Sequence, residues 1–577
     1  MEKHVIRRSP LVEVDTSLKQ LHPLLQRIYS HRGISSYQEI DYRFTNLLRP
    51  DSLKGLDTAL TLLTASLQTN QRICIIGDFD ADGATSTALA VKALTEFGAE
   101  NVSYIVPNRF EYGYGLTPEI VDLAAENKPD LIITVDNGIS SIQGVERANA
   151  FGIKVLVTDH HLPGNVLPKA EAIVNPNQPE CPFPSKNLAG VGVIFYLMSA
   201  LRTHLQKLNW FEQKNISLPN MAAFLDLVAL GTVADVVPLD QNNRILVDQG
   251  LQRIRVGRVR PGILALIEIA NRSITQLTST DLGFALGPRL NAAGRLDDMS
   301  IGIQCLLADS PHQAQVLARE LDNLNQERKS IESSMKVEAM SYLQALNLNE
   351  EALPAGVCVY KEDWHQGVIG ILASRIKDKI HRPTIVFAQS DNGEIKGSAR
   401  SVEGIHIRDV LDEVATTHPD LIKKFGGHAM AAGLTIQEDL YELFCQAFDK
   451  VVDKHAADDQ LAEKIYTDGG LSEQDISLST AEMIEKAGPW GQHFPMPLFD
   501  GEFYIVSVRV LANKHLKMIV AENEFSAHTF DAIWFNTDIA EFGQCENKKM
   551  HFVYSINVNE FRGVKSVQLM IEHAKYC

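Results

Sequence analysis

Long hydrophobic runs are absent from this sequence. No segment approaches the roughly 20 apolar residues that a helix needs to cross a bilayer, and residues 1–10 are charged and lack the apolar centre of a signal peptide. We therefore expect a cytoplasmic protein without membrane contact. A chain of 577 residues is too long for one hydrophobic core, and its 45% apolar and 22% charged content is ordinary for a globular protein. The sequence thus predicts several domains.

Cysteine is scarce, with seven residues scattered along the chain. None of them forms a C-x-x-C pair, which argues against a zinc site and against a disulfide framework. We interpret them as reduced thiols, most of which pack in the interior.

Basic residues are too few to balance the acidic ones. The chain has 54 Lys and Arg against 72 Asp and Glu, a formal charge of −18, which argues against a protein that coats nucleic acid non-specifically. A nuclease remains compatible with this balance, because acids that hold metal ions add to the negative count. Such an enzyme needs a local basic track to offset the general repulsion of phosphates.

From about residue 51, short apolar segments alternate with segments of helical periodicity. The segments predicted as strands are 73–76, 102–106, 131–135 and 154–157. The segments predicted as helices are 84–97, 118–125, 140–150, 191–207 and 221–230. Strands that alternate with helices predict an α/β fold with a doubly wound parallel sheet and helices on both faces.

The rest of the sequence predicts a second α/β lobe and a barrel. Residues 311–346 are polar, without glycine or internal proline, and predict a long connecting helix; a mixed pattern follows, with strands at 357–360 and 384–388 and a helix at 368–379. Segments 503–511, 515–521, 528–535, 549–557 and 566–573 predict a small antiparallel barrel of the OB type. The expected division is an N-terminal appendage at 1–50, a first lobe at 51–305, a connecting helix at 306–350, a second lobe at 351–460 and the barrel at 465–577.

The stretch G-D-F-D-A-D-G at residues 77–83 carries Asp78, Asp80 and Asp82 directly after a predicted strand. Ligands of open parallel sheets bind beyond the carboxyl ends of the strands. Acids clustered there are costly unless a cation compensates them. Taken alone, however, the stretch is best interpreted as a solvated acidic turn.

Further acids and histidines follow later apolar segments, at three more positions that are expected to be strand ends. Asp136 lies in V-D-N-G, His160 and His161 in T-D-H-H, and Asp235 in A-D-V after the apolar stretch 225–233. Each alone is best interpreted as a capping residue or a satisfied histidine. Four such positions, expected on one edge of one sheet, favour a centre for two divalent ions such as Mn²⁺ or Mg²⁺, with Asp136 as a candidate bridge.

This ordered set of motifs is similar to that of the DHH phosphoesterase superfamily. Residues 426–433, G-G-H-A-M-A-A-G, resemble the glycine-rich motif of the associated DHHA1 domain. With the barrel included, the chain resembles the single-strand-specific 5′→3′ DNA exonucleases of this superfamily from end to end. The resemblance implies metal-dependent release of 5′ mononucleotides from single-stranded DNA in recombination and repair, with a helicase and single-strand-binding protein as partners. We also expect a monomer.

The resemblance assigns the metal-site positions residue by residue. The implied metal ligands are Asp78, Asp80, Asp82, Asp136, His160 and Asp235. The implied catalytic residues are Asp80, Asp136, His160, His161 and Asp235. His160 is our choice for the direct ligand, with His161 nearby or facing the scissile phosphate; which acid of the first motif binds which ion stays open.

The chain departs from the family pattern at Ile76. Many members have histidine there, and isoleucine cannot ligate a metal. We expect one metal to have one ligand fewer, replaced by water or by Asp78, or to bind more weakly, with the reaction class unchanged.

Candidate phosphate-binding residues lie outside these motifs, and residues 287–295 are expected to form a glycine-bounded loop that carries two arginines. The full set of expected substrate-binding residues is Arg109, Arg289, Asn291, His365, Ser398, Arg400 and His428. Arg109 resembles the phosphate-contacting arginine of the family, and by resemblance Ser398 and Arg400 would hold the 5′-terminal phosphate. Arginine suits this role because its planar fork binds phosphate oxygens bidentately. The competing interpretation is a surface ion pair for the arginines and a structural role for His428 in its glycine turn.

Aromatic and basic side chains in the barrel are candidates for stacking and backbone contacts with a single strand. The aromatic candidates are Phe503, Tyr504, Trp534, Phe535, Phe552 and Tyr554. The basic candidates are Arg509, Lys514, Lys517 and Lys565. Because part of any such aromatic set faces inward as core, this list overstates the binding surface.

Two alternative functions are considered. A phosphodiesterase for short oligonucleotides or cyclic dinucleotides has the same chemistry, but the extra barrel argues against it. A non-catalytic DNA-binding replication scaffold requires broken metal motifs, and here Ile76 is the only hint of one.

Overall fold

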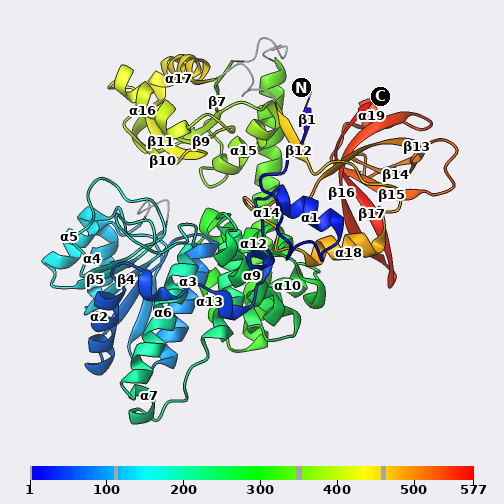
Figure 1. Ribbon diagram of the computed structural model, residues 1–577. Coiled ribbons are helices and arrows are strands. Elements are labelled where there is room, and N and C mark those ends of the chain that lie inside the picture. The colour runs from blue at the N-terminus through cyan, green and yellow to red at the C-terminus, as the bar shows by residue number, and fades with distance from the viewer. Residues whose placement is uncertain (1–2, 109–114, 346–353, 457–462) are drawn as a thin grey trace. The chain divides into compact units, whose positions relative to one another are not determined.

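The computed structural model describes residues 3–108, 115–345, 354–456 and 463–577. Its internal contacts define two compact units (Figure 1). The large unit comprises Arg7–Asp322 and Tyr466–Cys577, and the small unit comprises Met1–Ile6 and Asn323–Ile465. Among the described residues, no helix has both the length and the apolar character needed to cross a membrane.

A five-stranded parallel sheet forms the first part of the large unit, as the alternating pattern predicts. Its order is β3-β2-β4-β5-β6. The strands are β2 (Ile73–Ile76), β3 (Val102–Ile105), β4 (Leu131–Val135), β5 (Lys154–Thr158) and β6 (Ala172–Val174). β6 is the one strand of this sheet that the sequence did not indicate.

Helices cover both faces of this sheet because its strands are apolar on both sides (Figure 1). Alternate side chains, among them Ile76, Ile132 and Val157, pack with residues of α4 (Pro118–Glu126) and α5 (Ile142–Ala150). On the other face lie α2 (Leu56–Gln68), α3 (Ala81–Glu96) and α6 (Gly190–Lys207).

Helices continue the large unit beyond the sheet. They are α7 (Trp210–Gln213), α8 (Leu225–Ala234), α9 (Gln241–Arg255), α10 (Pro261–Ile269), α11 (Ser279–Asp281), η6 (Leu282–Leu286), α12 (Gly287–Leu296) and α13 (Ser300–Leu307). The expectation that Asp235 follows a strand is wrong, since the stretch before it is α8. Residues 225–232 are buried on every side, and an apolar run of that kind does not distinguish a buried strand from a buried helix.

The second part of the large unit is a closed barrel of the order β13-β14-β15-β17-β16. Its strands are β13 (Phe499–Leu511), β14 (His515–Ala521), β15 (Phe530–Phe535), β16 (Lys549–Phe561) and β17 (Val564–Tyr576), with α18 (Leu478–Lys486) and α19 (Ile539–Phe542) alongside. The pairing of β15 with β17 is parallel, which corrects the expectation of a purely antiparallel barrel. Closure leaves no open sheet edge.

The N-terminal segment packs against the residues that precede the barrel. Helix α1 (Pro23–Ser30) places Tyr29 over Trp490 and Phe494, with ring centroids 6.5 and 6.4 Å apart. Arg32 then donates two hydrogen bonds to Asp468. Residues far apart in the sequence therefore share one core.

The small unit contains a five-stranded mixed sheet of the order β10-β11-β9-β8-β7. Its strands are β7 (Val357–Tyr360), β8 (Thr384–Gln389), β9 (Glu394–Arg400), β10 (Lys424–Gly427) and β11 (Ala431–Gln437), and its helices are α15 (Ile369–Ile380), α16 (Ile407–Thr417) and α17 (Tyr441–His455). Sequence analysis did not indicate β9, β10 or β11. The long helix expected at 311–346 is confirmed as α14 (Pro311–Ala345), which begins in the large unit and ends in the small one. A two-stranded sheet of β1 (His4–Arg7) and β12 (Lys464–Thr467) completes the described strands.

Candidate metal centre

The turn between β2 and α3 is built to hold carboxylates close together. Asp80 caps α3, and its Oδ1 accepts hydrogen bonds from the backbone N–H of Asp82 (2.9 Å) and of Gly83 (3.0 Å). A Cβ on Gly83 would lie 2.5 Å from the carbonyl oxygen of Asp78, so this tight turn excludes any side chain there. The spacing G-D-F-D-A-D-G thus follows from strand, turn and helix start.

Asp82 is buried at the N-terminus of α6. Its carboxylate accepts hydrogen bonds from the backbone N–H of Gly190 (2.6 Å) and of Val191 (2.9 Å). Burial and the nearby Asp80 carboxylate nevertheless raise the pKa of Asp82 to about 7. The helix N-terminus therefore compensates this acid only in part.

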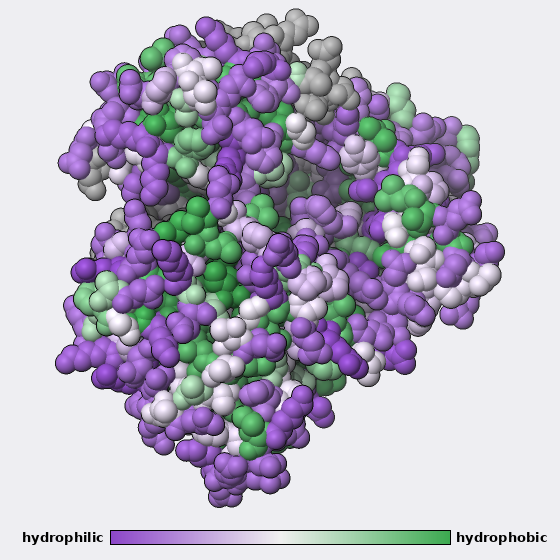
Figure 2. Space-filling model, turned by 60° about the vertical axis from the view of Figure 1, so that its left-hand side comes forward, coloured by the Kyte–Doolittle hydropathy of each residue, from purple (hydrophilic) through white to green (hydrophobic). Residues whose placement is uncertain are grey.

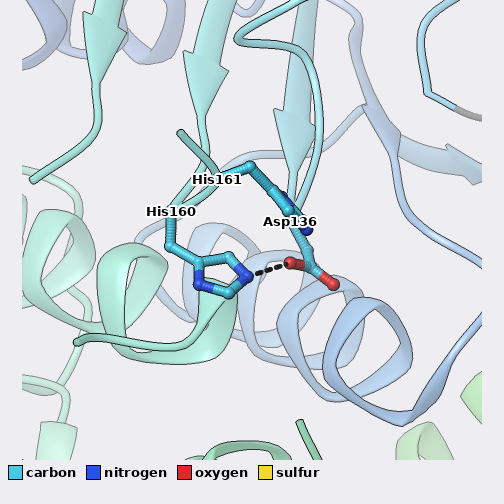
Figure 3. Close-up of side chains that lie close together, drawn as sticks. All are labelled: Asp136, His160 and His161. Atoms are coloured by element: carbon cyan, nitrogen blue, oxygen red, sulfur yellow. Dashed lines mark ion pairs between the residues drawn. The ribbon is translucent and has the colours of Figure 1, made fainter. Parts of the chain in front are cut away.

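Asp136 directly follows β4 and has a left-handed backbone conformation, with φ at 62°. Its Oδ1 lies 3.1 Å from His160 Nε2, and the two side chains face each other in Figure 3. A Cβ on Gly190 would lie 2.6 Å from the Cβ of Asp136, so the start of α6 is pressed against this acid. Asn137 secures the turn by donating hydrogen bonds to the carbonyl oxygens of Ile76 and Val135.

Asp159 organises the two histidines. Its Oδ1 accepts hydrogen bonds from the backbone N–H of His160 (2.7 Å) and of His161 (3.1 Å), and it lies 2.7 Å from His161 Nδ1. Burial alone would lower the pKa of His161, but the Asp159 carboxylate raises it to about 9. Although burial of Asp159 opposes ionisation, the hydrogen bond and charge of His161 lower the pKa of Asp159. The contact with Asp159 therefore favours the protonated form of His161.

Asp235 completes the cluster from the C-terminal end of α8. Its Oδ2 lies 3.4 Å from His160 Nε2. Burial, followed by the charges of other carboxylates, raises the pKa of both Asp136 and Asp235 well above the usual range. A bound cation would offset the repulsion between these carboxylates and so lower their pKa values.

All seven expected metal-site and catalytic residues of the four motifs converge in this cluster. Their ligand atoms form three groups, each within 4.8 Å: Asp136, His160 and His161; Asp82, His160 and Asp235; Asp78, Asp80 and Asp136. Asp136 and His160 each belong to two groups. Carboxylate oxygens with imidazole nitrogen suit Mn²⁺ and Mg²⁺, so the residues present fit the implied ions.

Ile76 contributes nothing to this cluster. It is fully buried and packs with Cys74, Ile132 and Val157 in the core beside α4 and α5. The position where relatives have a histidine is therefore occupied here by a core side chain.

Two of the expected substrate-binding residues lie on α12. The interpretation of residues 287–295 as a loop is wrong, because they are helical. Asn291 reaches the acidic turn, where its Oδ1 accepts a hydrogen bond from the backbone N–H of Ala81 (2.7 Å). Arg289 instead pairs with Asp322 at 2.9 Å, the ion-pair alternative considered for such arginines. Arg109 lies outside the described residues.

The other expected substrate-binding residues lie in the small unit. Ser398 and Arg400 are on β9, and Arg400 Nη1 donates to Ser398 Oγ at 3.1 Å. A Cβ on Gly370 would lie 2.9 Å from Arg400 Nη2 and 3.0 Å from Ser398 Oγ, so both side chains touch the first turn of α15. A helix N-terminus beside an arginine is a favourable anion site. The helix predicted at 368–379 is confirmed as α15, but sequence analysis did not assign the start of this helix to the phosphate site.

His365 and His428 lie elsewhere in the small unit. His365 Nδ1 accepts a hydrogen bond from the backbone N–H of Gly367 (3.1 Å), and burial lowers the pKa of His365. His365 also lines a cavity of about 370 Å³ with Trp364 and residues of α14. The backbone N–H of His428 donates to the carbonyl oxygen of Ala431 (2.8 Å) in the β10–β11 turn.

Most aromatic candidates of the barrel are core residues. Those that are buried are Phe503, Trp534, Phe552 and Tyr554. Phe535 is exposed and Tyr504 is half-buried, so these two remain available to a ligand. Figure 2 shows one face of the molecule. Most residues on this face are hydrophilic, and the hydrophobic ones gather in patches.

The parallel sheet and its acid–histidine centre define a DHH-type phosphoesterase. Three family models match the chain: "DHH family, N-terminal domain" at residues 72–232, "DHHA1 domain" at 354–454 and "RecJ OB domain" at 467–573. The first two match the expected superfamily.

Relatives that match along the whole chain identify a family within this class. The single-stranded-DNA-specific exonuclease RecJ of Escherichia coli (strain K12) is 51% identical over 98% of both chains. RecJ of Bacillus subtilis (strain 168) is 33% identical over 99% of this chain and 70% of its own. A crystal structure of Thermus thermophilus RecJ in complex with Mn²⁺ matches with a TM-score of 0.80 at 28% identity, covering 100% of this chain and 79% of that one; a Mg²⁺ complex matches with a TM-score of 0.74. This chain belongs to the RecJ family.

Proposed function

We propose that this protein is a single-stranded-DNA-specific exonuclease that degrades its substrate from the 5′ end and releases 5′ mononucleotides. The observation that carries the proposal is the convergence of four separate motifs on ligand groups that share Asp136 and His160. Whole-length similarity to single-stranded-DNA-specific exonucleases supports the substrate. Neither alternative function is favoured, since the barrel is present and all seven expected metal-site and catalytic residues lie in the ligand groups.

The side chains of the centre suit two divalent ions, Mn²⁺ or Mg²⁺. The proposed ligands are Asp78, Asp80, Asp82, Asp136, His160 and Asp235. Ions held there would polarise the scissile phosphate and activate water for attack. The protein itself supplies a buried set of ligand atoms, which the starts of α3 and α6 hold in place.

We propose that His161 acts on the scissile phosphate directly. Asp159 Oδ1 lies 2.7 Å from His161 Nδ1, and this contact orients the ring and favours its protonated form. A fixed positive charge stabilises the negative charge that develops during phosphoryl transfer. We therefore assign His161 to the scissile phosphate and Asp159 to its orientation.

Ser398, Arg400 and the start of α15 form the proposed site for the 5′-terminal phosphate. Arg400 supplies the charge, and the backbone N–H groups of the helix start supply further donors. Recognition of a terminal phosphate would make degradation begin at an end. The family likeness further supports a cytoplasmic monomer that acts in recombination and repair with a helicase and single-strand-binding protein.

Replacing Asp136 with alanine tests the assignment. The variant D136A should lose hydrolysis of 5′-labelled single-stranded DNA while it binds the DNA nearly as well as wild type, because Asp136 belongs to two ligand groups. D130A, which alters an acid at the start of β4, is the matched control. Cleavage by D136A at the wild-type rate would refute the proposed site.

A further inference from the structure

An exposed phenylalanine lies close to the metal centre and has no part in the chemistry above. Phe284 is 84% exposed. It belongs to the π-helix η6, which continues directly into α12. An exposed phenylalanine is ordinary by itself, so its position and surroundings decide whether it has a role.

Both ends of the helix that carries Phe284 are fixed to the metal centre. At its start, Cβ atoms on Gly283 and Gly287 would lie 3.1 Å from Val233 Cγ1 and 3.2 Å from Ala234 Cβ. Asp235 is the next residue of that chain segment. Phe284 thus lies at the end of α8 that supplies a proposed metal ligand.

At its other end the same helix touches the acidic turn. Asn291 accepts the hydrogen bond from Ala81 N–H, and a Cβ on Gly294 would lie 1.8 Å from the carbonyl oxygen of Phe79. The helix therefore spans from Asp235 to the G-D-F-D-A-D-G turn. This helix therefore borders the proposed metal centre.

The backbone is irregular where Phe284 is presented. Val236, directly after Asp235, has a φ of 61° and is 62% exposed. A β-branched residue in the left-handed region is strained, and such strain gathers at functional sites. π-helical turns also occur frequently at functional sites. Two exposed apolar side chains thus accompany two unfavourable conformations at one end of α8.

We propose that Phe284 is a stacking platform for an unpaired nucleobase of the DNA strand whose phosphate occupies the metal centre, with Val236 as the apolar neighbour of that base. The carboxylates would contact the DNA phosphates through bound cations and would make no contact with a base. An aromatic ring stacks on any base, independent of sequence. A base in a duplex is held between its neighbours and its partner, so this contact favours single strands. The inference rests on the proposed exonuclease function.

Variants of Phe284 separate stacking from a structural role. The set is F284A, F284L and F284W, with F151A as the matched control, because Phe151 is also exposed (47%) but follows α5 at the opposite edge of the sheet. Each variant is assayed for KM and kcat on 5′-phosphorylated single strands with an abasic residue at successive positions from the 5′ end. Thermal melting confirms that each variant is folded.

For the wild type, we expect one abasic position to raise KM by about 5- to 160-fold, the range for loss of one base–aromatic stack. F284A should raise KM on ordinary DNA by a similar factor and show no further loss at that position. F284W should retain the wild-type KM, and the KM of F284L should lie between those of wild type and F284A. The kcat of every variant should stay within about threefold of the wild-type value. A 2-aminopurine at the same position should be quenched on binding D136N, and not on binding D136N with F284L.

Two outcomes have different meanings. Wild-type protein that fails to digest single-stranded DNA contradicts the proposed function itself. If the wild type digests single-stranded DNA but F284A and F284L have the same KM as F151A on every abasic substrate, the stacking proposal alone is overturned.

Discussion

At the scale of single residues, the centre is a set of acids that destabilise one another until a cation binds. Burial and mutual repulsion raise the pKa of Asp82 to about 7 and shift the pKa of Asp136 and of Asp235 upward as well. A carboxyl whose folded-state pKa is raised contributes stability below its unfolded pKa, and this contribution is lost as pH rises through the folded pKa. Without metal, the protein should therefore become less stable as pH rises through about 7.

Melting temperatures in EDTA test whether stability falls as pH rises. Wild type should melt at a lower temperature at pH 8 than at pH 6, and D136N should narrow the difference, because it removes one of the repelling charges. Mn²⁺ should raise the melting temperature at pH 8 by mass action. D130N serves as the control. A wild-type melting temperature that is higher at pH 8 than at pH 6 in EDTA would contradict the electrostatic account.

Proton release on Mn²⁺ binding is a second consequence at this scale. A cation must displace the protons held by carboxyls with raised pKa values. Titration calorimetry at pH 6.5 in buffers of different ionisation enthalpy should show protons released, and Mn²⁺ affinity should increase from pH 6 to pH 8. Binding that releases no protons and is independent of pH would rule out these shifts.

The residues of the centre were predictable because their chemistry is local. Asp78, Asp80, Asp82, Asp136, His160, His161 and Asp235 stand in short motifs after apolar segments, and the structure brings them together. Their individual bonding partners were not predictable. The contacts of Asp82 with the start of α6 depend on how distant segments meet. The contact of Asp159 with His161 is local but depends on the geometry of the turn after β5, which the residue pattern does not specify.

At the scale of elements, errors arose where local patterns are ambiguous. Gly287, Pro288 and Gly294 suggest a loop, yet they lie in α12. Proline is tolerated in a first helical turn because its missing N–H has no partner there. Gly294 serves close packing against Phe79. Similarly, the strands β9 to β11 lie in a glycine-rich sequence that is typical of turns.

The packing of Gly294 gives a test at this scale. G294A should lower stability by about 1–3 kcal/mol, the usual range for overpacking, and weaken Mn²⁺ binding, because the new Cβ would lie 1.8 Å from the Phe79 carbonyl oxygen in the acidic turn. G164A, where no atom lies closer than 4.0 Å, is the control. Unfolding by denaturant and calorimetry measure both effects. An unchanged G294A would show that α12 does not fix the turn.

At the scale of the molecule, the N-terminal segment and the residues before the barrel form one core. Arg32 Nη1 and Nη2 lie 2.9 and 3.0 Å from the two oxygens of Asp468, and both side chains are 1% exposed. Sequence analysis treated residues 1–50 as an appendage, because a contact across more than 400 positions leaves no local pattern.

Breaking this buried pair should destabilise the large unit as a whole. R32A leaves the Asp468 carboxylate buried without its main partner, which typically costs about 3–5 kcal/mol. R43A, which removes an exposed pair with Asp41, should change stability little. Denaturant unfolding of the full chain gives the comparison. Equal stability of R32A and R43A would mean that the N-terminal segment does not share the core.

The most direct test of the central claim is digestion of DNA with a label at one end. With Mn²⁺ or Mg²⁺, purified protein should release 5′-labelled mononucleotide from single-stranded DNA as the first product. It should leave blunt duplex intact and lose activity in EDTA. Release of label from the 3′ end first, equal digestion of duplex, or undiminished cleavage in EDTA would contradict the account.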